Sequence, residues 1–504
     1  MRLSIAENAK RNMLWGIILY VYQILVPLAL RSVFIQRLGN EYVGLGGLFS
    51  SVLNFFNLAE MGVGSAVLYF LYQPVAEDDE KTIRQLLGFI KVIYRRIGLL
   101  IFGLGLSFAP FIRLLISGEP PADINIYVIY VLNLLQTALS YWLFPGKSLV
   151  PAAHQQNDMA SRISLAATTM RYALQFMILV RLPNYYIYLI AAILVQIIES
   201  TLLAFAVDRK YPQYRLSLPA TDAIEERVKQ KVGGLLFHNI GSVIVNSADA
   251  VVISAFLGLG VLGKYQNYLQ IMSAVSGMIG LINSSWRAGI GNIIARKDAD
   301  AVYRSFEHST FLSFCISTVC CCCFLNLYQP FISLWVGESL LLDDGLVVLL
   351  CVYFYTFRLM STGNMFESAG GIWERDKYRP LMEGLFNLGL NLVLVQSLGL
   401  YGILLSTILS MAFLSIPWLY HNVMRNFFQK STVCYFRTLL LYTASAAVIC
   451  VISYFMCGML PLSSCLVSTL LIKALISVAV SLALVYGFYH KCEAWKWMTG
   501  FIFR

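Results

Sequence analysis

The chain has 504 residues, of which 58% are hydrophobic and 13% are charged, and its mean hydropathy is +0.70. This composition excludes an ordinary soluble domain of the same length and indicates a polytopic membrane protein. The formal net charge of +10 arises largely in short loops between apolar segments. We therefore interpret the charge as membrane topology and not as a surface for nucleic acid.

A helix crosses the hydrocarbon core of a bilayer with about 20 mostly apolar residues. Runs of this kind predict six spans in the first half of the chain, near residues 13–33, 42–72, 91–116, 124–144, 160–181 and 185–207. Six more are predicted near residues 232–257, 264–295, 309–336, 345–369, 380–399 and 402–424. Two further spans, near 436–459 and 463–489, bring the expected total to about fourteen. The predicted fold class is thus an all-α polytopic membrane protein.

Basic residues in the loops predict the orientation of these spans. Of the 37 lysines and arginines, 26 lie in segments that share one side of the membrane. The positive-inside rule assigns that side to the cytoplasm, so both termini are expected there. The predicted division is a six-helix bundle over 1–207, a cytoplasmic linker over 208–231, a second six-helix bundle over 232–425, and two additional spans over 426–504.

A short motif indicates that the two bundles are copies of one unit. The pattern Leu-Gly-x4-Gly occurs at 38–44 and again at 257–263, an offset of 219 residues, and apolar segments stay in register around both occurrences. Because each copy contains an even number of spans, the two copies enter the membrane from the same side. Such a parallel repeat favours a central cavity between the halves and transport by alternating access.

Polar side chains within the spans are candidates for lining that cavity, because an unpaired polar group in hydrocarbon is costly. Gln23 and Arg31 share one face of the first span, and Asn246 lies on the repeat-equivalent face of the seventh. Asn54 and Gln270 lie in the second and eighth spans, which are also equivalent. The accompanying glycines and serines are interpreted as helix-packing positions.

Arginines within the spans suggest an anionic ligand. Arg171, Arg287 and Arg358 lie well inside spans, and Arg31 lies near an outer end. A guanidinium group is always charged and can bind a phosphate through two hydrogen bonds, although ion pairing between helices is the competing explanation. The predicted substrate-binding residues are Arg31, Arg171, Arg287, Arg358, Gln23, Asn54, Asn246 and Gln270.

Acidic residues within the spans are candidates for ion coupling or gating. They are Glu60, Glu199, Asp249, Glu367 and Glu383. A carboxylate held away from water can bind H⁺ or Na⁺ and couple an ion gradient to transport, or it can pair with an arginine. Asp249 and Arg31 occupy nearly equivalent positions of the two halves, and we predict that they pair across an outer gate. Restoration of transport by exchanging the two charges would test this pairing.

The sequence offers no enzyme active site. The five histidines are dispersed without metal-ligand spacing, and the cysteines, including the run 320–323, lie almost wholly within predicted spans. No catalytic residue, metal or bound cofactor is therefore predicted. An integral-membrane glycosyltransferase or polymerase is the alternative of a different class, and it is disfavoured because no predicted outer loop is long enough to house its active site.

Six short segments carry a resemblance to a known transporter family. In the first half they are RLGNEYVGL at 37–45, NLAEMGVGSA at 57–66 and LYQPVA at 71–76. In the second half they are SADAVVISAFLG at 247–258, GKYQNY at 263–268 and GIGN at 289–292. These segments resemble the polysaccharide flippases of the multidrug, oligosaccharidyl-lipid and polysaccharide exporter superfamily. Glu60 and Asp249 lie within these segments, and they are the predicted ion-coupling or gate residues, with H⁺ or Na⁺ as the candidate ion.

The resemblance implies a flippase of the bacterial cytoplasmic membrane. Such a protein moves a polyprenyl-diphosphate-linked oligosaccharide from the inner to the outer leaflet during surface polysaccharide biosynthesis. Membrane lipids, a polysaccharide polymerase and assembly proteins would be its partners. Two alternatives within the superfamily remain, namely a flippase for the peptidoglycan lipid precursor and a multidrug exporter. An exporter of organic cations would require an acidic cavity, whereas the charges within these spans are predominantly basic.

Overall fold

The computed structural model describes residues 5–502, apart from 58–59, 61, 234–235, 296–297, 371–375 and 460–465. The described side chains further exclude 5–10, 232–233, 236–239, 282, 284–289, 291–292, 295 and 501–502. The described part is built from helices and contains no strand, which confirms the predicted all-α class. The chain forms two compact units, Met1–Gly263 and Lys264–Arg504.

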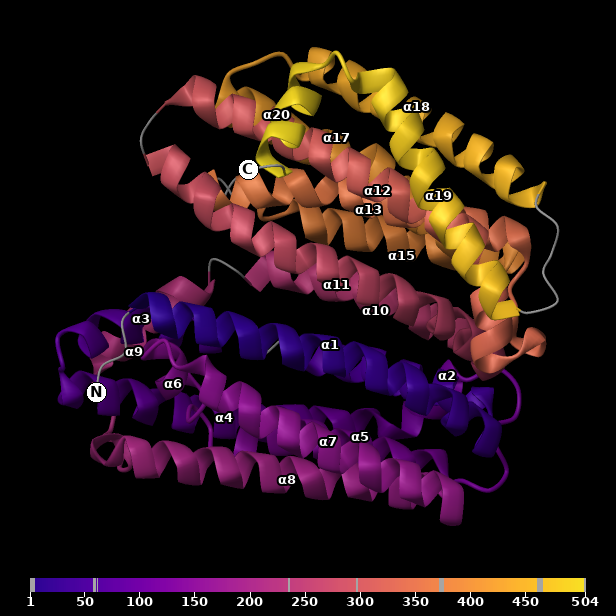
Figure 1. Cartoon of the computed structure of the whole chain (residues 1–504). Coiled ribbons are helices and arrows are strands. Elements are labelled where there is room, and N and C mark those ends of the chain that lie inside the picture. The colour runs from indigo at the N-terminus through magenta and orange to yellow at the C-terminus, as the bar shows by residue number, and fades with distance from the viewer. Residues whose placement is uncertain are drawn as a thin grey trace. The chain divides into compact units, whose positions relative to one another are not determined.

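Unit 1 contains ten α-helices and two short 3₁₀ helices within the described residues (Figure 1). The α-helices are α1 (Ile5–Arg37), α2 (Asn40–Phe56), α3 (Val63–Ala76), α4 (Glu80–Phe108), α5 (Ile126–Trp142), α6 (Leu149–Ala153), α7 (Asn157–Arg181), α8 (Tyr185–Lys210), α9 (Asp222–Gly233) and α10 (Leu236–Leu257). The 3₁₀ helices are η2 (Ala109–Leu115) and η3 (Pro212–Tyr214). Helix α7 packs against both α1 and α8, α4 packs against α5, and α10 packs against α2.

Unit 2 begins within α11 (Leu259–Ala295), because the first turn of this helix belongs to unit 1. Its other helices are α12 (Ala299–Val336), η4 (Glu338–Leu340), α13 (Asp344–Gly370), α15 (Arg379–Leu398), α16 (Leu400–Ser410), η5 (Met411–Ser415), α17 (Ile416–Asn422), η6 (Val423–Phe428), α18 (Thr432–Gly458), α19 (Leu466–Tyr489) and α20 (Glu493–Ile502). Helix α12 contacts α13, α18 and α19, so it forms the centre of this unit. Phe306 on α12 and Phe366 on α13 are fully buried in an aromatic core, with ring centroids 5.0 Å apart.

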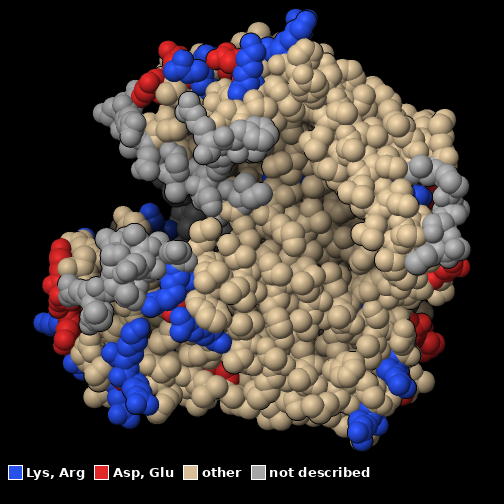
Figure 2. Space-filling model, in the orientation of Figure 1, with Lys and Arg blue, Asp and Glu red and all other residues tan. Residues whose placement is uncertain are grey.

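The lengths and compositions of these helices suit a membrane. Eleven helices in the described part are long and apolar enough to cross one, and α3 and α5 are shorter apolar helices. This number is consistent with the expected total of about fourteen spans. On the face shown in Figure 2, charged side chains gather toward the helix ends, and the surface between them is made by uncharged residues. The chain is therefore a multi-pass membrane protein.

The second predicted span is not one continuous helix. One span was expected near residues 42–72, but α2 ends at Phe56 and α3 begins at Val63. Gly62 precedes α3 with a φ of +100°, a left-handed conformation that glycine adopts without the steric cost of a Cβ atom. The expectation failed because the turn at 57–62 interrupts the apolar sequence with only two strongly polar side chains, Asn57 and Glu60, so hydropathy predicts one span from the runs on either side of it.

The two copies of the Leu-Gly-x4-Gly motif form similar turns. The first glycine of each copy has a positive φ, +109° at Gly39 and +88° at Gly258, and each lies directly before a helix. The predicted equivalence of these two turns is thus matched by the backbone conformation. Asn40, at the start of α2, also donates a hydrogen bond of 2.8 Å to the carbonyl oxygen of Gly260, at the start of α11.

Candidate functional site

Three helices of unit 1 bring two of the predicted arginines to one tyrosine. Arg31 comes from α1, Arg171 from α7 and Tyr188 from α8, and both guanidinium groups act electrostatically on Tyr188. The packing of α7 against α1 and α8 places these side chains together. We call Arg31, Arg171, Tyr172, Tyr185 and Tyr188 the arginine–tyrosine group.

The tyrosines of this group form a partly stacked aromatic surface. The rings of Tyr185 and Tyr188 lie 6.2 Å apart at an interplanar angle of 26°, and Phe34 of α1 packs edge-on against Tyr188 at 5.2 Å. Tyr185 is buried, whereas Arg31 and Tyr188 are half-buried. The group therefore combines cationic groups, phenol hydroxyls and ring faces at a site that a ligand can partly reach.

Arg171 is held by aromatic contacts. Its guanidinium carbon lies 5.0 Å from the ring centroid of Tyr172, and its Nη2 atom donates a 3.4 Å hydrogen bond to the Tyr172 hydroxyl. Within the described part of the chain, no carboxylate lies within 4.0 Å of the Arg171 guanidinium. A ring face stabilises a cation without neutralising it, so the Arg171 guanidinium keeps its capacity to bind an anionic oxygen.

Glu60 lies in the turn between α2 and α3, and it contacts a neighbouring helix. Its Oε1 atom accepts a 2.7 Å hydrogen bond from the hydroxyl of Tyr94 on α4. Tyr141 of α5 donates a 3.2 Å hydrogen bond to Asn57 beside it, and the rings of Tyr94 and Tyr141 lie 5.6 Å apart. The predicted ion-coupling residue thus belongs to a tyrosine-rich polar cluster that is built by two helices, α4 and α5, and the turn after α2.

The remaining predicted residues of unit 1 occupy different environments. Gln23 on α1, Asn54 on α2 and Asn246 on α10 are exposed, and Asn246 donates a 2.7 Å hydrogen bond to the carbonyl oxygen of Ser242. Asp249 is buried on α10, with 9% of its surface exposed. Its pairing with Arg31 stays a prediction.

Arg358 is the most enclosed of the predicted arginines whose side chains are described. It lies on α13 with 4% of its surface exposed, beside Cys320 of α12. Its Nε atom has no hydrogen-bond partner among the described residues, and no described carboxylate lies within 4.0 Å of it. Gln270 on α11 is half-buried, and the side chain of Arg287 lies outside the described residues. Of the predicted arginines with described side chains, Arg31 and Arg171 thus belong to unit 1 and Arg358 belongs to unit 2.

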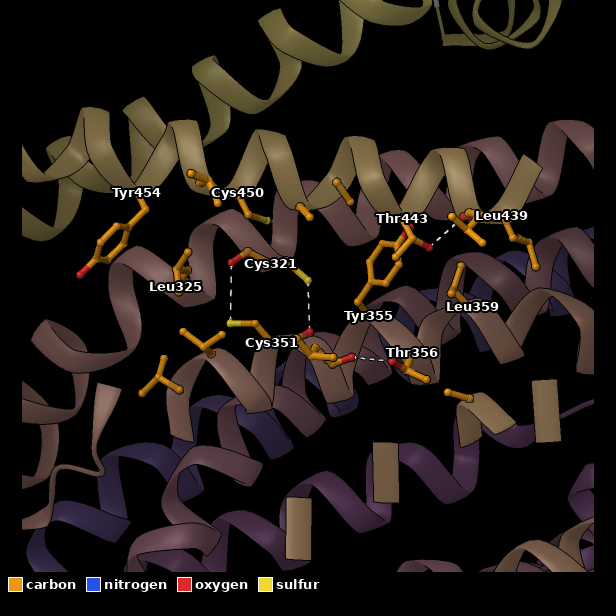
Figure 3. Close-up of a pocket in the computed structure, with 18 of the residues that line it drawn as sticks. Cys321, Leu325, Cys351, Tyr355, Thr356, Leu359, Leu439, Thr443, Cys450 and Tyr454 are labelled. Atoms are coloured by element: carbon orange, nitrogen blue, oxygen red, sulfur yellow. Dashed lines mark hydrogen bonds between the residues drawn. The ribbon is translucent and has the colours of Figure 1, made fainter. Parts of the chain in front are cut away.

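Unit 2 also contains an apolar cavity that the sequence did not reveal (Figure 3). The cavity has a volume of about 720 Å³, and most of its lining comes from α12, α13 and α18. At its wall, the Sγ atoms of Cys321 and Cys351 each donate to the other residue's carbonyl oxygen, at 3.5 and 3.9 Å. Tyr355 and Thr443 also line it. The run of cysteines at 320–323 was the only sequence signal here, and it indicated packing residues, not a cavity.

No protein-family model and no curated protein matches the sequence, but its fold is similar to solved transporters. The lipid II flippase MurJ, in an inward closed conformation, matches with a TM-score of 0.69 and 15% identity over 95% of this chain and 99% of that one. An inward-facing multidrug resistance MATE family transporter of the MOP superfamily matches with a TM-score of 0.63 and 13% identity, over 80% of this chain and 94% of that one. A third match is a MOP superfamily transporter from Pyrococcus furiosus, which is described as having a binding pocket of reverse polarity. Its TM-score is 0.54 and its identity is 12%, over 85% of this chain and 98% of that one. At these identities the similarity establishes the fold.

Proposed function

We propose that the chain is a flippase that moves a polyprenyl-diphosphate-linked oligosaccharide from the inner to the outer leaflet of a bacterial cytoplasmic membrane by alternating access. The arginine–tyrosine group carries this proposal. Two guanidinium groups suit the diphosphate, since arginine binds phosphate oxygens through paired hydrogen bonds. Tyrosine hydroxyls and ring faces suit the sugars, which present hydroxyl groups and apolar ring edges.

The apolar cavity of unit 2 supports a substrate that carries a long hydrocarbon chain. Its lining is dominated by aliphatic and aromatic side chains, with few polar groups such as Thr356, Gln329 and Asp344. A small sugar would gain little from such a lining, whereas a prenyl chain is stabilised by removal of its surface from water. Because the cavity and the arginines differ so strongly in polarity, an amphiphilic substrate fits the chain better than a uniformly polar one.

The alternatives differ in the charge and size of what is moved. A flippase for the peptidoglycan lipid precursor would use the same cationic and apolar features, and MurJ, with which the fold is shared, is described as a lipid II flippase. A multidrug exporter for organic cations is disfavoured by the two arginines acting on Tyr188. An enzyme of glycosyl transfer is disfavoured because the similar solved folds are transporters.

We further propose that Glu60 or Asp249 couples transport to H⁺ or Na⁺. Glu60 accepts a hydrogen bond from Tyr94, and the hydroxyl can reorient when the carboxylate gains or loses a cation. Partner proteins would be the polymerase and the assembly proteins of surface polysaccharide synthesis, which take up the translocated oligosaccharide.

Reconstitution into vesicles tests the proposed function. Purified protein would be mixed with a fluorescent polyprenyl-diphosphate oligosaccharide, a lipid II analogue or a fluorescent organic cation, with and without imposed H⁺ and Na⁺ gradients. We expect transfer of the oligosaccharide lipid between leaflets to exceed that in protein-free vesicles, and transfer of the cation to be absent. Faster transfer of lipid II than of any oligosaccharide lipid would favour the peptidoglycan alternative, and no transfer of either lipid would refute the flippase.

Cysteine labelling tests the proposed topology. Cys434, at the start of α18, and Cys492, after α19, are both exposed and both lie in segments expected to face the cytoplasm. In oriented membrane vesicles, a membrane-impermeant maleimide should therefore modify these two residues only from the cytoplasmic side. Variants in which each is replaced by serine serve as controls. Modification of either cysteine from the opposite side would contradict the predicted orientation.

A further inference from the structure

One end of unit 2 holds a buried cluster of charged residues. Arg379, on the first turn of α15, pairs with Glu367 of α13 at 3.5 Å and with Glu383 of α15 at 3.9 Å, and its Nε atom donates to Asp376. We call Glu367, Asp376, Arg379 and Glu383 the carboxylate cluster. Their side chains are between 0% and 6% exposed, so water screens these charges poorly.

The cluster contains more acids than bases. Three carboxyl groups surround one guanidinium, so full ionisation would leave two uncompensated negative charges at a buried site. The charged groups that act on Glu367 are Asp376 and Arg379, and the same two residues act on Glu383. The neighbouring amides are uncharged. Asn364 accepts a 2.9 Å hydrogen bond from Arg379, and Asn422 of α17 donates one of 2.9 Å to Asp376. A buried charge without an opposite partner is strongly destabilising, so this charge excess must be reduced.

A second observation indicates that the excess negative charge of the cluster is reduced at Glu367. The Oε1 atom of Glu367 is buried and receives no hydrogen bond from any described donor. Glu367 and Asp376 both contact the Arg379 guanidinium, Glu367 at Nη2 at 3.5 Å and Asp376 at Nε, so their carboxyl groups lie beside each other. Two carboxylates in contact repel each other, whereas a single proton between them supplies the missing donor and removes one charge.

We propose that Glu367 and Asp376 form a proton-binding site in which one proton is shared between the two carboxyl groups. A metal cation is the competing ligand. It is disfavoured because no group of three histidine, cysteine or acidic side chains among the described residues is arranged to hold a metal ion. The site is built entirely from residues of unit 2, and it does not depend on the identity of the transported substrate.

The proton would hold three helices together. Glu367 is near the end of α13, Asp376 lies just before α15, and Asn422 is the last residue of α17. Loss of the proton leaves two repelling carboxylates at the junction of these helices, so the stability of the folded protein should fall as the pH rises. Replacement of Glu367 by glutamine keeps the shape of the side chain and removes the repulsion, so this pH dependence should weaken in that variant.

Infrared spectroscopy of the full-length protein in vesicles tests the proposal directly. The carbonyl stretch of a protonated carboxyl group should be present at neutral pH in the unmodified protein and should be lost in both Glu367→Gln and Asp376→Asn. Glu338→Gln, at an exposed glutamate of η4, is the matched control and should leave the band unchanged. Absence of the band at neutral pH, or its persistence in both cluster variants, would overturn the proposal. A band that forms only when Na⁺ is withheld would instead identify a metal site and would equally overturn it.

Discussion

Replacing Arg171 by glutamine is expected to slow transfer of an anionic lipid-linked oligosaccharide by about tenfold to a hundredfold without unfolding the protein. A hydrogen bond to a charged group contributes roughly 1.5–3 kcal/mol, and about 1.4 kcal/mol corresponds to one factor of ten. The described residues place no carboxylate within 4.0 Å of this guanidinium. Its removal therefore leaves no described acid without a partner, and folding should be little affected. The measurement is the initial rate of leaflet transfer in vesicles that contain equal amounts of protein.

The same helix supplies the matched control. Arg181, the last residue of α7, is exposed and lies outside the arginine–tyrosine group, so Arg181→Gln should transfer the substrate at the normal rate. Arg171→Lys keeps the charge but loses the paired hydrogen bonds, and it should fall between the two glutamine variants. Equal rates for Arg171→Gln and Arg181→Gln would show that Arg171 does not bind the substrate.

Local patterns predicted the helices well and the contacts between them poorly. Helix α8 was expected over 185–207 and spans Tyr185–Lys210, and α19 was expected over 463–489 and spans Leu466–Tyr489. Hydropathy locates such helices because each one must be apolar over the thickness of a bilayer. Hydropathy did not predict the turn before α3, because this turn depends on the conformation of one glycine.

In the candidate site too, the sequence predicted individual residues but not the contacts between them. Arg31 and Arg171 were identified because a charge within a span requires a functional or structural reason. Tyr188 was missed because its role depends on the packing of α8 beside α7, and nothing in the local sequence reports that contact. Glu367 and Glu383 were recognised as acids within spans, but their shared contact with Arg379 joins residues of two helices. A single sequence identifies the chemical groups, whereas packing decides which of them meet.

The second large effect is expected at the glycines that end the repeated motif. Gly44 on α2 and Gly263 on α11 are equivalent in the repeat, and each packs against the backbone of the other motif. A Cβ atom added at Gly44 would collide with the carbonyl group of Leu259 and come within 3.2 Å of the Gly263 nitrogen. One added at Gly263 would collide with the carbonyl oxygen of Asn40. The two contacts are reciprocal, because Asn40 and Leu259 are themselves equivalent positions.

Alanine at either glycine should therefore destabilise the protein by about 3 kcal/mol, at the upper end of the usual cost of overpacking, because the obstacle is backbone that no side-chain rotation can move. Gly260 is the matched control, because it lies on the same helix as Gly263 and a Cβ atom there meets nothing within 4 Å. Gly260→Ala should instead stabilise the helix by up to about 1 kcal/mol, since alanine favours a helix more than glycine. Thermal unfolding in detergent, followed by a dye that labels cysteines as they become exposed, measures both effects. If Gly263→Ala lowers the unfolding temperature and Gly260→Ala raises it, the close approach of the two backbones lies at Gly263. Equal changes in unfolding temperature for the two variants would show that α2 and α11 do not meet there.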